Sequence, residues 1–396
     1  MRVLLFTGKG GVGKTTTAAA TAAHAAALGR KVLVLSTDPA HSLADAFGLP
    51  LGGEPTEVDT GLYAMQVDVQ SAFERTWRDV QDYLSGVLQR AGVDVLQAEE
   101  LTVLPGAEEV LALLELTSQI GSGRWELVVV DCAPTGETLR LLALPEALRW
   151  YVDKVFPAHR RALSAVRPLL SRTGAVAVPD DGVFAAVERL HRELTEVRAV
   201  LTSPATSVRL VLTPEAVVVA EARRTLTTLA LYGYRVDGIV ANRVIPSGGD
   251  DPWRAGWVRS QSEQLAAVRR DAGGLPVALA PYRPDEPVGL AALTAHGAAL
   301  YAGADPLATP VGAAELLSVE RSADGFVLSV ALPLARREDL DLARSGDELV
   351  LTVAGHRRVL ALPSALRRCV VAGASLAGGQ LAVRFEPDPE LWMRTP

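Results

Sequence analysis

Cysteine and lysine are both scarce in this chain of 396 residues. The two cysteines, Cys132 and Cys369, lie far apart in the sequence, which argues against a disulfide framework and against a cysteine-rich metal site within one chain. Only four lysines occur, against 35 arginines. Two of them, Lys9 and Lys14, fall within one six-residue segment. Composition alone would rarely place two of four lysines so close together. A compact ammonium group suits a crowded phosphate site better than a planar guanidinium does.

Strong basic charge and long apolar runs are also missing. The net charge of −7 and the isoelectric point of ≈ 5.5 argue against nucleic acid or an anionic membrane surface as the main partner. The uncharged stretch 287–304 is rich in alanine and glycine, so it predicts a helix of a soluble protein and no stable membrane insertion. The first apolar strand begins at once, without a signal peptide, so we expect a cytoplasmic protein.

A glycine-rich loop follows the apolar run 3–6 and precedes an alanine-rich helix predicted from Thr15 to Leu28. The loop reads Gly8, Lys9, Gly10, Gly11, Val12, Gly13, Lys14, Thr15 and Thr16. This order of strand, loop and helix is typical of a P-loop, whose backbone N–H groups surround a phosphate chain. We therefore expect nucleotide binding, with Lys14 reaching the β- and γ-phosphates and the Thr15 hydroxyl on Mg²⁺.

Asp38 lies in the segment 36–42, directly after the second predicted strand. Ligands of an open α/β sheet bind at the carboxyl ends of its strands, so this loop should face the P-loop. Asp38 is then a candidate to position or deprotonate an attacking water. Alternatively, Asp38 or Ser42 only caps a helix. The segment alone favours neither interpretation.

Asp131 follows the apolar run 127–130. A carboxylate at the end of such a strand stands at the Walker B position, where it holds Mg²⁺ directly or through water. A helix-capping aspartate is the alternative, and the P-loop in the same chain favours the metal role. Gly136 leaves the following loop free to move and to sense the γ-phosphate.

Apolar strand-like runs alternate with helical stretches up to about residue 303. We expect strands at residues 3–6, 32–35, 62–67, 127–130, 208–212, 238–240 and 277–279. Several lack alternation, as strands covered on both faces do, so we predict an α/β P-loop NTPase fold with a mostly parallel sheet. The helical stretches at about 69–120 and 144–201 are too long for single crossovers and predict an inserted helical subdomain.

Residues 304–312 read as a linker, after which the hydrophobic period becomes two. Alternating runs at 326–332, 349–353 and 381–385 are separated by turn signals at 345–347, 355–356 and 378–379. We therefore predict a small β-sandwich at residues 313–388 beside a nucleotide-binding domain at residues 1–303.

The doubled lysine resembles the deviant Walker A motif of the ParA, MinD, ArsA and nitrogenase iron-protein group. In that group the first lysine reaches across a homodimer interface to the partner's nucleotide, which implies such a catalytic role for Lys9. The segments DPAHS at 38–42 and DCAPTGETLRLL at 131–142 resemble switch I and switch II of the ArsA family. That family includes arsenite-pump ATPases and ATPases that target tail-anchored membrane proteins. Motifs at 105–109, 212–215, 240–243 and 281–290 extend the resemblance over about residues 1–303.

The resemblance implies an ATPase in which Asp38 activates water and Asn242 contacts adenine. It also implies that the loop near Pro281 and Tyr282 closes over the base. ATP is favoured over GTP because residues 242–245 do not form the guanine-binding motif of GTPases.

Two features depart from the family pattern. Cys132 stands where the family usually has threonine. Residues 248–257 contain no cysteine, although the targeting ATPases carry a zinc-binding CxxC pair there, so we expect no zinc between subunits. The thiolates that would bind arsenite are also missing.

Residues 314–387 resemble an α-crystallin (small heat-shock) domain. The whole chain therefore predicts Mg²⁺-dependent ATP hydrolysis by a homodimer, coupled to a conformational change that binds or targets client proteins, including membrane proteins. The alternatives are the catalytic subunit of an arsenite export pump and a positioning ATPase of the MinD or ParA kind. The missing thiols and the single P-loop disfavour the first alternative. The second predicts an amphipathic C-terminal membrane helix, which the sequence lacks.

Overall fold

A computed structural model of the chain describes residues 1–38, 42–67, 107–133, 135, 192–308 and 316–392. The predicted helical subdomain falls mostly outside these residues, as does Gly136. The described parts of the predicted helical subdomain are α6 (Ala107–Gly121) and residues 192–201, and both are helical as predicted. No helix in the described part of the chain is long and apolar enough to cross a bilayer.

An eight-stranded sheet forms the centre of the larger domain, in the order β3-β4-β2-β5-β1-β6-β7-β8. Its strands are β1 (Arg2–Thr7), β2 (Val32–Ser36), β3 (Thr56–Asp59), β4 (Leu62–Gln66), β5 (Leu127–Asp131), β6 (Thr206–Leu212), β7 (Val236–Val244) and β8 (Val277–Pro281). Neighbouring strands are parallel except β3 and β4. The predicted α/β class and all seven predicted strands are confirmed. The edge strand β3 was not predicted, because its Thr-Glu-Val-Asp sequence is short, charged and mostly exposed.

Helices cover both faces of this sheet, which explains the apolar strands without alternation. Successive residues of β1 point to opposite faces, so Leu4 joins one core cluster and Leu5 the other. Besides α6 and the helix at residues 192–201, the described helices of this domain are α1 (Lys14–Ala27), α2 (Ser42–Phe47), α10 (Ala216–Tyr232), α11 (Pro252–Asp271) and α12 (Leu290–Tyr301). The helix predicted at 15–28 is confirmed as α1. It packs closely on α12, where a Cβ at Gly297 would meet the Ala20 carbonyl oxygen at 2.2 Å.

The C-terminal domain is a sandwich of two antiparallel sheets, β14-β15-β10-β9 and β11-β12-β13. Its strands are β9 (Leu317–Ser322), β10 (Gly325–Ala331), β11 (Leu340–Ser345), β12 (Glu348–Val353), β13 (His356–Ala361), β14 (Cys369–Ala377) and β15 (Gln380–Pro387). Short helices occur at η1 (Arg337–Asp339), α13 (Ser364–Arg367) and α14 (Pro389–Trp392). The predicted β-sandwich and its three turns are confirmed. The strands β9, β11, β13 and β14 were not predicted.

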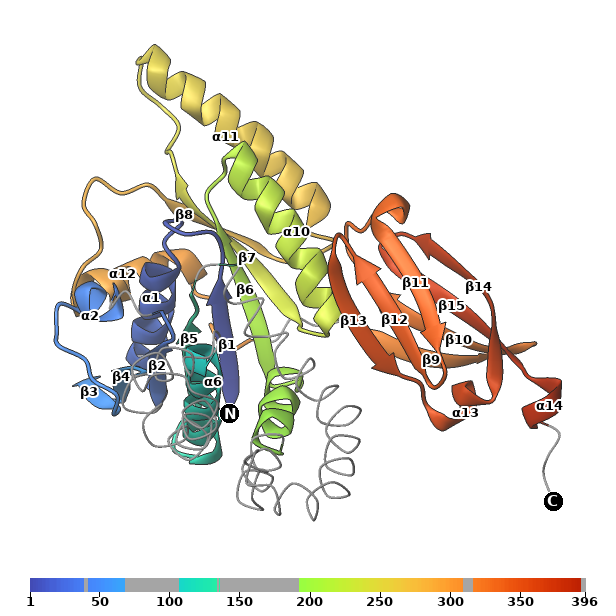
Figure 1. The fold of residues 1–396 in the computed structure, drawn as a ribbon. Helices are drawn as coiled ribbons and strands as arrows, with labels where there is room; N and C mark the ends of the chain where they lie inside the picture. Colours follow the sequence, from blue (N-terminus) through green and yellow to red (C-terminus); the bar gives the residue numbers. More distant parts are fainter. Residues whose placement is uncertain (39–41, 68–106, 134, 136–191, 309–315, 393–396) are drawn as a thin grey trace, which may run out of the picture.

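The sandwich packs against the C-terminal end of α10 (Figure 1). Leu231 of α10 is fully buried within the hydrophobic core of the sandwich. The Thr227 hydroxyl donates a hydrogen bond to the Pro333 carbonyl at 2.5 Å. The buried Arg358 of β13 donates to the Leu231 carbonyl. The two domains therefore share an apolar and a polar contact, beyond the linker that joins them.

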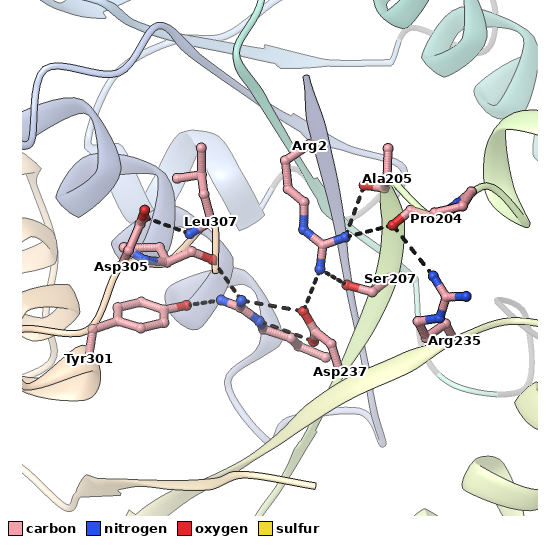
Figure 2. A network of polar contacts seen from close by, with 11 residues as sticks. Arg2, Pro204, Ala205, Ser207, Arg235, Asp237, Tyr301, Asp305 and Leu307 are labelled. Atoms are coloured by element: carbon pink, nitrogen blue, oxygen red, sulfur yellow. Dashed lines mark hydrogen bonds and ion pairs between the residues drawn. The ribbon is translucent and has the colours of Figure 1, made fainter. Parts of the chain in front are cut away.

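A buried polar network ties the start of that linker to the sheet (Figure 2). The Asp237 carboxylate accepts hydrogen bonds from Arg2 at 2.9 Å and from Arg209 at 3.2 Å. Arg209 also donates to the Tyr301 hydroxyl at 2.6 Å and to the Pro306 carbonyl at 2.7 Å. Arg2 and Asp237 lie near the starts of their strands, so this network occupies the edge of the sheet opposite the strands' carboxyl ends.

Candidate nucleotide site

The P-loop, Asp38 and Asp131 meet at the carboxyl edge of the sheet because β5 lies between β1 and β2. Phe6 of β1 pairs with Asp131, and Ser36 of β2 pairs with the same residue from the other side. The loops that follow these three strands therefore leave the sheet side by side. This is the position at which open α/β sheets bind ligands.

The P-loop has a backbone that requires glycine at several positions. Gly11 and Gly13 have left-handed φ values of 79° and 91°, which L side chains rarely adopt. A Cβ at Gly8 would lie 2.0 Å from the Val211 carbonyl oxygen. Gly13 is the N-cap residue directly before α1, and it has no side chain to cap the first N–H groups of the helix. The loop thus has the form of an anion-binding helix start, as the sequence predicted.

Lys14 lies almost entirely buried at the start of α1. Its ammonium lies 3.5 Å from the Lys9 carbonyl oxygen, across the turn of the loop. Within the described part of the chain this is the one hydrogen bond of the Lys14 ammonium. A buried ammonium group so weakly paired is costly unless it has a further anionic partner. The geometry therefore fits a phosphate group held inside the loop.

Asp131 is a fully buried carboxylate at the end of β5. The Ser36 hydroxyl donates to its Oδ2 at 3.2 Å, and Oδ1 has no hydrogen-bond partner among the described residues. Burial raises the pKa of Asp131 to about 6, although a hydrogen bond from Thr15 and the charge of Lys14 both oppose the shift. A buried, partly unpaired carboxylate beside a hydroxyl offers the hard oxygen ligands that Mg²⁺ prefers. The residues present therefore fit a magnesium ion held by Asp131 and Thr15.

Asp38 lies next to this carboxylate. Its backbone N–H donates to the Ser36 hydroxyl at 3.2 Å, and its carbonyl accepts from the Gln66 amide at 3.0 Å. The charge of Asp38 contributes to the raised pKa of Asp131, so the two carboxylates interact electrostatically. The sequence placed Ser36 in the segment 36–42 without assigning it a role, and it did not single out Gln66. Both are polar residues at the last position of an apolar strand, which is the signal that would have found them.

The segment that follows β2 also contacts the P-loop through Ser42 and Thr15. Their hydroxyl oxygens lie 3.1 Å apart, and Ser42 begins α2. The intervening residues 39–41 lie outside the described part of the chain. The segment after β2 therefore faces the P-loop as predicted, while the role of Asp38 in hydrolysis stays a prediction.

Lys9 points away from the buried part of the loop. Its side chain is 40% exposed, and its ammonium lies 3.9 Å from the Glu221 carboxylate of α10. Its predicted action on a partner's nucleotide requires an exposed side chain, and this one is exposed. The role across a dimer stays a prediction.

A pocket of ≈ 400 Å³ opens beside the P-loop. Its lining residues are Gly13, Thr16, Asn242, Arg243, Pro281, Tyr282, Arg283, Pro284, Asp285, Glu286, Pro287 and His296. It thus contains all three residues predicted to contact the base, namely Asn242, Pro281 and Tyr282. The Asn242 amide also donates to the Val12 carbonyl at 2.8 Å, so this residue joins the pocket to the P-loop. His296 was not predicted, because a lone histidine in an alanine-rich helix gives no sequence signal.

Comparison with known proteins agrees with this geometry. A family model described as an anion-transporting ATPase, ArsA_ATPase, matches residues 1–302. The chain belongs to the ArsA ATPase family. As an ArsA-family ATPase it hydrolyses ATP. A second model, an HSP20-like domain found in ArsA, matches residues 323–385, which confirms the predicted resemblance of the sandwich to small heat-shock domains.

Three relatives show the range of this family. A putative arsenical pump-driving ATPase of Prosthecochloris vibrioformis is 38% identical, over 77% of this chain and 76% of its own length. An uncharacterized protein of Streptomyces coelicolor is 41% identical over 100% of both chains. The ATPase GET3 of Malassezia globosa is 32% identical, over 60% of this chain and 71% of its own length. Two of these matches cover 77% and 60% of this chain, and the third covers all of it, including the sandwich.

Proposed function

We propose that this ArsA-family ATPase acts as an Mg²⁺-dependent homodimer that couples ATP hydrolysis to the binding or targeting of client proteins. The observation that carries the proposal is the convergence of the P-loop, Asp38 and Asp131 at one edge of the sheet. The exposed Lys9 supports the dimer, and the resemblance to targeting ATPases supports the client.

In this mechanism the P-loop amides and Lys14 bind the phosphates of ATP. Asp131 and Thr15 would hold a magnesium ion, which neutralises negative charge on the phosphate oxygens. Asp38 orients or deprotonates the attacking water, and Ser36 holds the Asp38 backbone close to Asp131. Lys9 of each subunit stabilises charge in the partner's site, as an arginine finger does.

Loss of the γ-phosphate would release the contacts made by the loops after β2 and β5. Order and disorder of such loops drive subunit rearrangement in many nucleotide switches. The resulting movement would open or close a client-binding surface on the helical subdomain. ATP binding would therefore favour the client-bound dimer, and hydrolysis would favour release.

An arsenite pump subunit is the second candidate, favoured by the name of the Prosthecochloris relative. Two observations count against it. The described residues contain no group of three or more His, Cys, Asp or Glu side chains suited to hold a metal. Both cysteines are buried, and they lie in different domains.

The test measures ATP turnover, mass and client binding on the full chain. We expect ATP turnover only with Mg²⁺. We expect the Asp38→Asn protein to be mainly dimeric in ATP and to form a smaller fraction of dimer in ADP. The same protein should retain a test client with a C-terminal hydrophobic helix and not the client lacking that helix. A monomer under all nucleotide conditions would contradict the dimer. Equal retention of both clients would contradict the targeting role.

A further inference from the structure

Strand β7 contains a β-bulge in the wall of the pocket beside the P-loop. Ala241 of β7 pairs with Leu279 of β8, and the next pair along the two strands is Val244 with Pro281. β7 therefore uses one more residue than β8 over this interval. Within the bulge, Arg243 has a left-handed φ of 56°, which is unfavourable for a residue other than glycine. Such residues persist only where the surrounding structure holds them, and bulges often re-aim side chains next to functional sites.

Gln261 of α11 holds this bulge. It is a buried glutamine, only 5% exposed. Its Nε2 donates to the Arg243 carbonyl at 3.1 Å, and its Oε1 accepts from the Ile245 N–H at 2.8 Å. Because the end of a glutamine side chain carries both a donor and an acceptor, one residue pairs with backbone groups on either side of Val244. The left-handed turn at Arg243 is thereby fixed from a neighbouring helix.

The bulge is joined to both sides of the pocket. On one side, the Asn242 amide donates to the Val12 carbonyl of the P-loop at 2.8 Å, and its Oδ1 accepts from the Arg243 N–H at 2.9 Å. On the other side, the Tyr282 N–H donates to the Val244 carbonyl at 2.8 Å. Asn242, Arg243 and Tyr282 all line the pocket. The conformation of the bulge therefore sets how Asn242 and Tyr282, both predicted to contact the base, are placed relative to each other.

We propose that Gln261 is a positioning residue of the nucleotide site, which holds the bulge at Arg243 and so keeps the nucleoside part of the pocket in its binding shape. This inference rests on the nucleotide site of the proposed function. Gln261 acts through the Arg243 backbone and does not itself touch the nucleotide. Without it, the left-handed turn is formed in only a fraction of the molecules, and the affinity for the nucleoside falls by that fraction. The phosphates bind to the loop at residues 8–16, so their affinity does not depend on Gln261.

The experiment measures binding of ADP and of tripolyphosphate, which lacks a nucleoside, to the full chain with Mg²⁺. Gln261→Met keeps the length of the side chain and removes both hydrogen bonds. We expect it to weaken ADP binding roughly tenfold and to leave tripolyphosphate binding unchanged. Gln261→Glu keeps the acceptor for the Ile245 N–H and loses the donor to the Arg243 carbonyl, so it should also weaken ADP binding. Gln264→Met is the matched control, because Gln264 is a half-buried glutamine three residues later on the same helix.

A second substitution separates a positioning role from a purely structural one. Glycine adopts a positive φ without the penalty of a side chain, so Arg243→Gly reduces the need to hold the turn. Gln261→Met should therefore weaken ADP binding less in an Arg243→Gly background than in the natural chain. The comparison within each background cancels the effect of losing the arginine side chain. Thermal unfolding of every variant shows that it is folded at the temperature of the assay.

Three results would overturn the proposal. Equal ADP affinity in Gln261→Met and the natural chain would mean that Gln261 only anchors α11, whatever the unfolding temperature of the variant. Equal weakening of ADP and tripolyphosphate would place the effect outside the nucleoside part of the pocket. A Gln261→Met effect that Arg243→Gly leaves unchanged would show that Gln261 does not act through the turn. Failure of the natural chain to bind ADP would instead overturn the nucleotide site itself, and this inference with it.

Discussion

The Lys9 ammonium lies 3.9 Å from the Glu221 carboxylate, so the first lysine of the P-loop contacts α10 of its own subunit. Both side chains are partly exposed, at 40% and 30%. Exposed ion pairs of this kind contribute only about 0–1 kcal/mol to stability, so Lys9 can leave Glu221 at little cost. The other end of α10 is embedded in the sandwich. The same helix therefore contacts the nucleotide loop at one end and the C-terminal domain at the other.

Replacing Lys9 with alanine should slow ATP hydrolysis strongly and change ADP binding little. Residues that act as an arginine finger contribute about 10³–10⁵ to the rate, whereas the phosphates are held mainly by backbone amides and Lys14. Glu221→Gln is the matched control, because it breaks the same ion pair and keeps the lysine. It should retain hydrolysis, with an unfolding free energy within about 1 kcal/mol of the natural chain.

Mixing two inactive variants tests whether Lys9 acts across the dimer. In a heterodimer of Lys9→Ala and Asp38→Asn subunits, action across the dimer leaves one site with both an intact Asp38 and an intact Lys9. Mixing should then restore up to about a quarter of the natural activity, because half of random dimers are heterodimers with one working site. If Lys9 acts on its own subunit, no site is intact and mixing restores nothing.

Asp38→Asn should abolish most hydrolysis and leave the affinity for ATP nearly unchanged. The carboxylate is expected to activate or position water, and general-base catalysis typically contributes ~10²–10⁴-fold. The P-loop, which binds the phosphates, is untouched by this change. Turnover and equilibrium binding of ATP measure the two effects separately. Asp45→Asn, at an exposed carboxylate of α2, is the control, and undiminished turnover in Asp38→Asn would remove Asp38 from the mechanism.

Asp131→Asn should stabilise the nucleotide-free protein while it abolishes Mg²⁺-dependent activity. Burial raises the pKa of this carboxyl from 3.8 to about 6, so the folded state binds a proton more readily than the unfolded state. The ionised form therefore costs stability, by about 2–3 kcal/mol above pH 6. The stabilisation by asparagine should be full above pH 6 and should decline as the pH falls toward 4. Denaturant unfolding at several pH values measures it, and a destabilised variant at pH 7.5 would contradict this account.

Much of this site was predictable because its chemistry depends on residues close in sequence. The glycine spacing with Lys14 and Thr15 defines a local loop, and the apolar strands before Asp38 and Asp131 place both at the carboxyl edge. The fold class followed from the same strands. The edge strand β3 was missed because antiparallel pairing with β4 stabilises it, and its own sequence has little strand character.

Other features depend on contacts between distant segments. His296 reaches the pocket only because α12 packs on α1, and Gly297 permits that close approach. Glu221 meets Lys9 only through the position of α10 beside the P-loop. The burial of Leu231 in the sandwich depends on how two domains pack. No local pattern around these residues reports such contacts.

Arsenite and zinc should have no effect on hydrolysis. Burial raises the pKa of the Cys132 thiol well above its usual range and also raises that of Cys369, so neither forms the thiolate that soft metals bind. Metal analysis of the purified chain should find no stoichiometric zinc. Turnover with and without arsenite or antimonite provides the second measurement. Strong stimulation that is lost in Cys132→Ser would support the pump interpretation.

Ending the chain at Pro310 should leave a folded protein that hydrolyses ATP but is less stable than the full chain. All predicted catalytic residues precede the cut, and so does Pro306, whose carbonyl accepts from Arg209 at 2.7 Å. The cut exposes Leu231, whose side chain is buried in the sandwich core, and full burial of a leucine contributes about 1.5–3 kcal/mol. Circular dichroism, thermal unfolding and ATP turnover on the shortened and full chains measure these effects.

The isolated sandwich should fold but unfold more easily than in the full chain. It is small, so the loss of one core side chain and of the Arg358 bond to α10 is a large fraction of its stability. Arg358→Ala in the full chain should loosen the same contact without removing the domain, and should lower the unfolding temperature without lowering turnover.

If the shortened chain stays folded but no longer hydrolyses ATP, the sandwich must contribute to the active site or to the dimer. The two domains would then not be functionally separable, and the contact along α10 would be the route by which the sandwich affects catalysis.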